Sequence, residues 1–281
     1  MERPSGRAVA GLTVVTLVNF LNFADRYVVG GVQELIKKDL SFAGGERDAA
    51  TGFISDSSLG WITTMFVIVY MLASPVTGWL GDRVPRRFLI FGGVLVWSLA
   101  TVASGLAPTF GMLLVARAFI GAGEAGYATV APGLIADLFP VAWRNRAMGI
   151  FNVVVPLGSA VGFGIGATIG QHHGWRSAFF VAGGPGLLLA IVALFLPEPE
   201  RGANDAPEDK GHTLPAWDGV KALLSNKTFL VNTSGQVLMT FTVGGLANWM
   251  PSFLIRYTGV EAGEAGTYFG AVTALAGLLS A

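Results

Sequence analysis

Four ionisable residues lie inside long apolar stretches of this chain. Asp25 and Arg26 are in the first stretch, and Arg117 and Glu124 are in the fourth. A charge at the centre of a membrane-spanning helix costs about 2.5–3.5 kcal/mol, so such residues are expected to face a protein interior or a watery cavity. Arg117 and Glu124 are seven residues apart and share a helical face, with Gly121 between them to leave room. We expect the four charges to lie near one another.

Three interpretations of these charges are open. In the first, the four residues form two fixed ion pairs that only lock helices together. In the second, Asp25 or Arg26 lies near enough to the outer interface to be solvated. In the interpretation we favour, the arginines bind an anion and a carboxylate carries a proton. The planar guanidinium binds two phosphate oxygens at once. An anion that takes the arginine deprives the carboxylate of its partner, and the carboxylate then takes up a proton. Transport by Glu124→Gln that keeps its full pH dependence would contradict this.

Polar residues recur along two of the apolar stretches. Asn19, Asn22 and Arg26 follow one face of the first stretch, and Asn152 and Ser159 form a weaker stripe in the fifth. Stripes on several helices indicate a shared central cavity. The seventh stretch can add Asn248 and Trp249 to it.

Composition supplies the elements that position these residues. The chain is 52% hydrophobic and 13% charged, with a mean hydropathy of +0.59, whereas soluble domains carry about 25% charged residues. A bilayer is crossed by roughly 20 apolar residues. The sequence predicts spans near 9–36, 58–80, 88–106, 110–137, 145–170, 175–196, 228–254 and 263–281.

Basic residues in the connections predict the orientation. The N-terminus, loops 81–87 and 138–146 and segment 197–227 carry eleven, and the opposite side carries five. The positive-inside rule places the N-terminus and segment 197–227 in the cytoplasm. Segment 197–227 holds four prolines and mixed charge. It is predicted to be a cytoplasmic linker between a six-helix bundle, 1–196, and the first two helices of a second bundle, 228–281. Trp217, Val220 and Leu224 share a helical face there, which favours either a short surface helix or a solvated linker with a chance stripe.

The connection between the second and third spans is rich in glycine and charge. Its residues Gly78, Leu80, Asp82, Arg83, Arg86 and Arg87 resemble the signature loop of the major facilitator superfamily, with Pro85 in place of a glycine. In that family the aspartate and first arginine form a charge cluster that opens during conformational switching. The resemblance implies gating roles for Gly78, Asp82, Arg83, Arg86 and Arg87. It also makes Asp137 the acidic partner of Arg83.

Within that superfamily the chain is most similar to the spinster lipid transporters. The similarity lies in residues 22–27, residues 121–139, and residues 248–251 with 265–270. It implies an all-α membrane protein of the major facilitator fold, comprising the first six-helix half and the start of the second. It also implies proton-linked alternating-access transport of lysophospholipids or sphingosine-1-phosphate-like lipids. The implied proton-coupling residues are Asp25 and Glu124, and the implied substrate-binding residues are Arg26, Arg117, Asn22, Tyr127, Asn152, Asn248 and Trp249. The short start before the first span is typical of bacterial members, so we expect the protein in the bacterial inner membrane. We also expect a monomer.

Two other function classes stay open. One is a proton-coupled symporter of small organic anions such as sugar acids, and the other is a non-transporting membrane scaffold, which the buried charges disfavour. A net charge of zero gives no indication of a nucleic-acid partner. We expect no enzymatic catalysis, cofactor or metal, because the chain has no cysteine and the adjacent His172 and His173 make an incomplete metal site.

Overall fold

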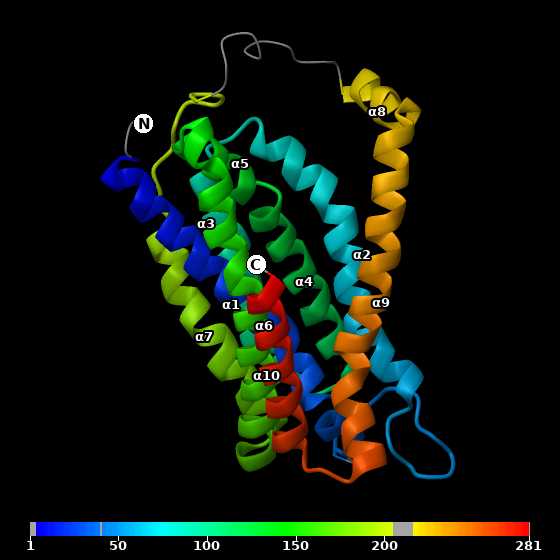
Figure 1. Cartoon of the computed structure of the whole chain (residues 1–281). Coiled ribbons are helices and arrows are strands. Elements are labelled where there is room, and N and C mark those ends of the chain that lie inside the picture. The colour runs from blue at the N-terminus through cyan, green and yellow to red at the C-terminus, as the bar shows by residue number, and fades with distance from the viewer. Residues whose placement is uncertain (1–3, 40, 205–215, 281) are drawn as a thin grey trace.

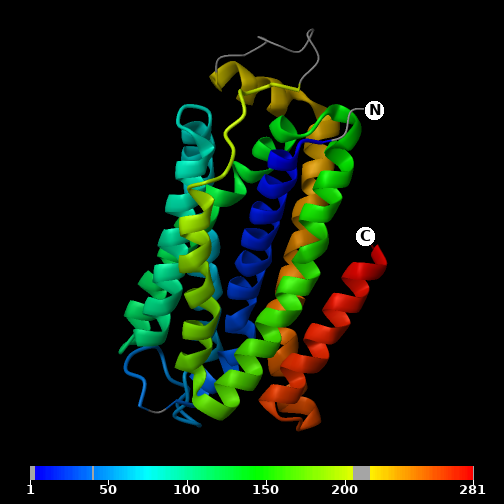
Figure 2. The same ribbon diagram turned by 90° about the vertical axis from the view of Figure 1, so that its left-hand side faces the viewer.

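The computed structural model describes residues 4–39, 41–204 and 216–280, which form helices and no named strand. In chain order these are α1 (Gly6–Lys38), α2 (Asp56–Gly81), α3 (Arg86–Leu106), α4 (Phe110–Ala128), α5 (Ala131–Leu138), α6 (Val141–His173), α7 (Trp175–Ala193), α8 (Ala216–Ser225), α9 (Lys227–Thr258) and α10 (Ala262–Ser280). The long helices run side by side between two ends of the molecule (Figures 1 and 2). α8 lies at the same end as the N-terminus, and the α1–α2 connection lies at the opposite end. The all-α prediction is confirmed.

Six of the described helices are long and apolar enough to cross a membrane: α1, α2, α3, α6, α7 and α9. α4 has 19 residues but carries Arg117 and Glu124, which lower its hydropathy. α10, also 19 residues long, is likewise outside this set. Following the predicted orientation, we name the end with the N-terminus and α8 the inner end, and the end with the α1–α2 connection the outer end.

The fourth span was predicted as one continuous helix, and this prediction is wrong. The sequence predicted one helix over 110–137, whereas the structure ends α4 at Ala128 and begins α5 at Ala131. Pro132 lies at the start of α5 and explains the break. Proline has no N–H to donate, and inside a helix its ring clashes with the carbonyl four residues earlier, here that of Ala128. The break places Asp137 on the short helix α5.

Glycines allow α1 and α6 to approach closely. A Cβ atom added to Gly158, Gly162 or Gly166 of α6 would collide with a backbone carbonyl of α1. At Gly162 the atom struck is the carbonyl oxygen of Ala24, one residue before Asp25. Small residues of this kind let membrane helices pack closely, and here they position the charged part of α1.

The predicted linker contains a helix, α8, whose Trp217 and Leu224 side chains are 68% and 62% exposed. α9 follows it, and its residues 227–246 are exposed while Pro251 and Ser252 are buried. α9 therefore contacts the first six spans chiefly through its outer half. At the start of α2, the Ser55 side chain accepts a hydrogen bond from the backbone N–H of Ser58 and caps the helix.

Candidate functional site

Arg26 of α1 forms an ion pair with Glu124 of α4. Its Nε lies 3.0 Å from Oε2 of Glu124, and its Nη2 contacts the same oxygen. The Glu124 side chain is fully buried, whereas that of Arg26 is 25% exposed. The rings of Phe23, Phe66 and Tyr70 lie 5.0–5.4 Å from the Arg26 guanidinium. Arg26 is thus held by one carboxylate and three aromatic rings at the centre of the bundle.

Arg117 is buried without such a partner. It is 1% exposed, its Nε and Nη1 have no hydrogen-bond acceptor among the described residues, and it lies 5.4 Å from the Phe66 ring. The shared helical face had suggested proximity to Glu124, yet seven residues span about 10.5 Å along a helix axis, too far for a direct pair. The expectation that Gly121 leaves room between them is wrong. Gly121 instead meets the backbone of α2, where a Cβ atom would collide with the carbonyl oxygen of Phe66.

Both arginines line a cavity of about 190 Å³ that also reaches α2 and α9. We call it the arginine cavity. Asn248 of α9 contributes to its wall and accepts a hydrogen bond of 2.7 Å from the Thr63 hydroxyl. Trp249 is outside this lining. It lies beside Gly60 of α2 and packs against a cluster of buried apolar side chains that includes Leu59 and Ile62. The structure therefore brings Asn248 to the predicted cavity and leaves Trp249 out of it.

A second cavity of about 180 Å³ lies on the other side of Arg26, and we call it the amide cavity. Asn22, Tyr127 and Asn152 line it together with Arg26. The Tyr127 hydroxyl donates a 2.8 Å hydrogen bond to the carbonyl of Val15, and Nδ2 of Asn22 has no acceptor within the described ranges. Arg26 is common to both cavities. The α1 stripe and Asn152 of the α6 stripe meet at this cavity, whereas Ser159 is outside its lining and donates to the carbonyl of Val155.

Asp25 points elsewhere. Successive helical residues are about 100° apart, and Asp25 lines neither cavity. It is 1% exposed, and its Oδ2 accepts a 2.5 Å hydrogen bond from the Thr101 hydroxyl of α3. The alternative in which Asp25 is solvated at the outer interface is therefore wrong. Sequence reasoning missed Thr101, although the hydroxyls of Ser98, Thr101 and Ser104 in an apolar stretch mark a polar side of α3.

The inner loop between α2 and α3 pairs differently from the expectation. Asp137 of α5 binds Arg86, with 2.5 Å between Nη1 and Oδ2, rather than Arg83. Arg83 stacks on the Trp79 ring at 4.0 Å and donates to that residue's carbonyl at 3.0 Å. The reason is local: Arg86 begins α3 and faces α5, whereas Arg83 folds back onto the last turns of α2. Among the described residues, no atom of another element lies within 4 Å of the Cβ position of Gly78.

The segment after α7 binds both helix ends that flank this loop. The Glu198 carboxylate accepts the backbone N–H groups of Arg86 and Arg87, each at 3.0 Å. The Arg201 guanidinium donates to the carbonyls of Gly81 at 2.7 Å, of Val84 at 2.8 Å and of Asp82. The Glu198 carboxylate thus lies at the positive N-terminal end of the α3 dipole, and the Arg201 guanidinium lies at the negative C-terminal end of the α2 dipole. The sequence interpretation treated this segment only as a linker and missed both residues.

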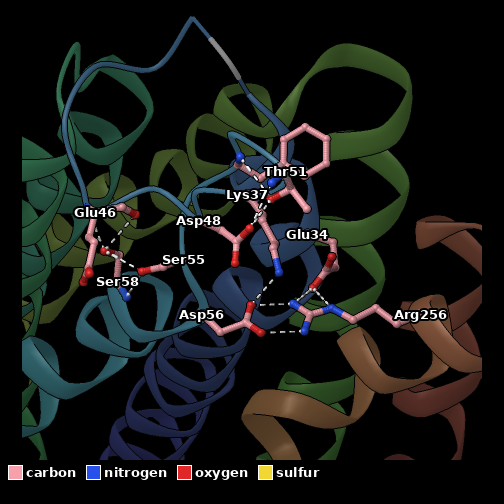
Figure 3. A network of polar contacts seen from close by, with 10 residues as sticks. Glu34, Lys37, Glu46, Asp48, Thr51, Ser55, Asp56, Ser58 and Arg256 are labelled. Carbon is pink, nitrogen blue, oxygen red and sulfur yellow. Dashed lines mark hydrogen bonds and ion pairs between the residues drawn. The ribbon is translucent and has the colours of Figure 1, made fainter.

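An ion-pair cluster at the outer end joins α9 to α1 and α2 (Figure 3). Arg256 donates to Glu34 at 2.5 and 2.9 Å and to both oxygens of Asp56 at 2.7 and 2.8 Å. Lys37 adds a 2.7 Å contact to Asp56. We call Glu34, Lys37, Asp56 and Arg256 the outer cluster. The sequence assigned no chemistry to these residues, because they are far apart in the chain.

Asp39, just after α1, ties this helix to α7. Its Oδ2 accepts from Trp175 Nε1 at 2.9 Å and from Arg176 Nη1 at 3.1 Å. Partial burial opposes ionisation, but hydrogen bonds from Ser41, Trp175 and Arg176 outweigh it and lower the pKa of Asp39 to about 2. Asp39 is therefore a stable anion and acts as a structural anchor.

Long apolar helices that gather buried arginines, carboxylates and amides around internal cavities define a polytopic α-helical membrane protein. Residues 15–281 match the family model of the Major Facilitator Superfamily. The chain belongs to this family, and the superfamily prediction is confirmed.

Curated relatives support the predicted resemblance to spinster proteins. Protein spinster homolog 1 of Homo sapiens is 38% identical over 258 residues, which cover 89% of this chain and 46% of that protein. Protein spinster of Drosophila melanogaster is 33% identical over 276 residues, which cover 95% of this chain and 44% of that protein. The chain spans about half the length of the curated relatives it matches.

Solved structures agree with the fold. A bacterial homolog of the human lysosomal transporter Spinster, in an inward-facing and unoccupied conformation, is 27% identical, with a TM-score of 0.79. The match covers 98% of this chain and 61% of that one. A D-xylose–proton symporter is 18% identical, with a TM-score of 0.64 over 95% of this chain and 65% of its own. That second likeness concerns the fold alone.

Proposed function

We propose that the protein is a proton-coupled secondary transporter of amphipathic anionic lipids, of the lysophospholipid or sphingosine-1-phosphate type. The observation that carries this proposal is Arg117, a buried guanidinium at the wall of the arginine cavity whose Nε and Nη1 have no acceptor among the residues that the structure describes. Burying an unpaired charge is costly, and a phosphate entering the cavity supplies the missing acceptors in the bidentate geometry that guanidinium groups favour.

In this proposal the side chains around the two cavities divide the work. Arg26 and Arg117 bind the headgroup, while Tyr127 and the amides lining the cavities, those of Asn22, Asn152 and Asn248, add hydrogen bonds. Trp249 borders the α2–α9 contact rather than touching the headgroup. Asp25 and Glu124 carry protons. Substrate phosphate competes with Glu124 for Arg26, and the displaced carboxylate takes up a proton because its burial disfavours an unpaired charge.

Alternating access then depends on the two ends of the bundle. At the inner end the loop residues Gly78, Asp82, Arg83, Arg86 and Arg87, with Asp137, regulate opening through contacts that change during the cycle. Such a cycle requires both halves of the fold, with the substrate near the bilayer midplane. The proposed location is a bacterial inner membrane. The N-terminus is assigned to the cytoplasm because eleven basic residues lie in the connections on that side and five on the other.

Uptake into proteoliposomes tests the proposal. Labelled lysophospholipid and a labelled sugar acid are offered to vesicles containing the intact protein, with and without an imposed pH gradient. Lipid uptake that follows the gradient supports the proposal. Sugar-acid uptake with inert lipid refutes the substrate class, and no uptake of either refutes transport of these anions.

A further inference from the structure

Asp25 and Thr101 form an isolated polar pair between α1 and α3. Thr101 is fully buried and Asp25 is 1% exposed. The hydroxyl of Thr101 is the one hydrogen-bond donor that the described residues present to this carboxylate, whose Oδ1 has no partner. A buried carboxylate normally accepts several hydrogen bonds. The stability of the ionised Asp25 carboxylate therefore depends strongly on the hydrogen bond from Thr101.

The Thr101 hydroxyl has two acceptors within reach but only one proton. Its Oγ1 lies 2.5 Å from Oδ2 of Asp25 and 3.0 Å from the carbonyl oxygen of Trp97. A hydroxyl donates one hydrogen bond and accepts up to two. The group can therefore point its proton at Asp25, or turn it to Trp97 and accept a proton from Asp25.

We propose that Thr101 is a positioning residue that supports both protonation states of Asp25; this inference rests on the proposed proton coupling. With Asp25 ionised, Thr101 donates its O–H to the carboxylate. With Asp25 protonated, the carboxylic acid donates to Thr101 Oγ1, and the threonine donates to the Trp97 carbonyl. In the protonated state the transported proton is held by Asp25 itself, and between the two states the hydroxyl proton of Thr101 only changes its direction. Neither state leaves the Thr101 hydroxyl unsatisfied.

The charges that act on Asp25 come from α4 and from its own helix. These charged groups are Glu124 and Arg117 of α4 and the neighbouring Arg26. Arg26 is engaged by Glu124, and Arg117 has no hydrogen-bonded contact with Asp25 in the described part of the chain. The short-range stabilisation of the Asp25 anion therefore comes from Thr101.

Two hydroxyl deletions in α3 provide a matched test. Thr101→Val keeps the shape of the side chain and removes the hydroxyl, and Thr101→Ser keeps a hydroxyl. Ser104→Ala is the control, because the equally buried Ser104 hydroxyl donates only to the Ala100 carbonyl, at 2.9 Å. Initial rates of lysophospholipid uptake by the intact protein are measured as a function of pH.

Thr101→Val loses a hydrogen bond in both states of Asp25, and a bond to an ionised group is about twice as strong as one between neutral groups. The ionised state is therefore destabilised more than the protonated one, by roughly one pH unit. Thr101→Val is therefore expected to move the half-maximal rate to higher pH by about that amount, while Thr101→Ser and Ser104→Ala retain the wild-type profile. A Thr101→Val profile identical to wild type overturns the inference and leaves proton coupling intact. A wild type whose uptake is independent of pH overturns both.

Infrared spectroscopy keeps the inference testable if Thr101→Val does not fold. In the wild-type protein, a titrating C=O band that is absent from Asp25→Asn belongs to protonated Asp25. We expect it at the lowered frequency of a hydrogen-bonded acid. A band at the frequency of a free acid, or no such band, overturns the inference.

Discussion

Replacement of Arg256 by glutamine is expected to weaken closure of the outer end. The variant loses the ion pairs to Glu34 and Asp56. Exposed ion pairs contribute about 0.2–1 kcal/mol each. The Asp56 side chain is 47% exposed and that of Glu34 only 5%, so the Glu34 pair is the less screened of the two. We assign the Arg256 ion pairs about 1.5–2 kcal/mol in total. Their loss corresponds to a roughly tenfold to thirtyfold shift toward states with an open outer end.

Distances between spin labels measure this shift. The chain contains no cysteine, so labels are attached to cysteines introduced only at Ala49, in the α1–α2 connection, and at Glu264, in the first turn of α10. Both positions are exposed. The expected result is a new population at longer distance in Arg256→Gln. Lys38→Gln removes the same charge at the same end from an exposed residue outside the outer cluster. Equal distance distributions in wild type and Arg256→Gln, or an equal shift in the Lys38 control, would refute the reasoning.

Three further predictions concern stability. Gly162→Leu is expected to lower the thermal unfolding temperature by overpacking against α1, at about 1–3 kcal/mol, whereas Gly164→Leu, with nothing within 4 Å of its Cβ position, is tolerated. Asp39→Asn is expected to cost about 1–2 kcal/mol near neutral pH after allowance for solvent screening. Because the folded pKa of Asp39 is depressed to about 2, this contribution is present above the unfolded value of about 3.9 and disappears as pH falls toward the folded one; melting curves across that range check it. Glu198→Gln is expected to raise hydrogen exchange at the α3 N-terminus through loss of about 0.5–1 kcal/mol, while Glu200→Gln leaves it unchanged.

The helical framework was predictable because membrane spans follow from apolar length. Helical structure corresponds to each of the eight predicted spans, with boundaries shifted by a few residues, and residue 281 of the last span lies outside the described residues. The exception is the break between α4 and α5. An apolar run hides such a break, because hydropathy does not register the missing N–H of Pro132. Its effect depends on whether neighbouring helices accommodate a kink, and here the chain turns instead.

Most residues of the site could be predicted from the sequence, but the ion pairs and hydrogen bonds between them could not. Burial of charges inside spans indicated that Asp25, Arg26, Arg117 and Glu124 lie near one another. Arg26 and Arg117 line one cavity, whereas Asp25 lines neither cavity. The partners could not be derived, because helical spacing orders residues within a helix but does not determine which neighbour each helix meets. Glu124 therefore turned out to pair with α1, and Asp25 with a threonine of α3. Glu198 and Arg256 were missed for the same reason, since each acts on residues more than 100 positions away.

Proton exchange on substrate binding tests the central claim most directly. Lysophospholipid is added to the purified intact protein in weakly buffered solution containing a pH indicator, and bound lipid is measured in parallel. If a phosphate displaces Glu124 from Arg26, the wild type takes up protons as lipid binds, and Glu124→Gln binds lipid without that uptake. Lipid binding by the wild type without proton uptake, or unchanged proton uptake in Glu124→Gln, would contradict the account.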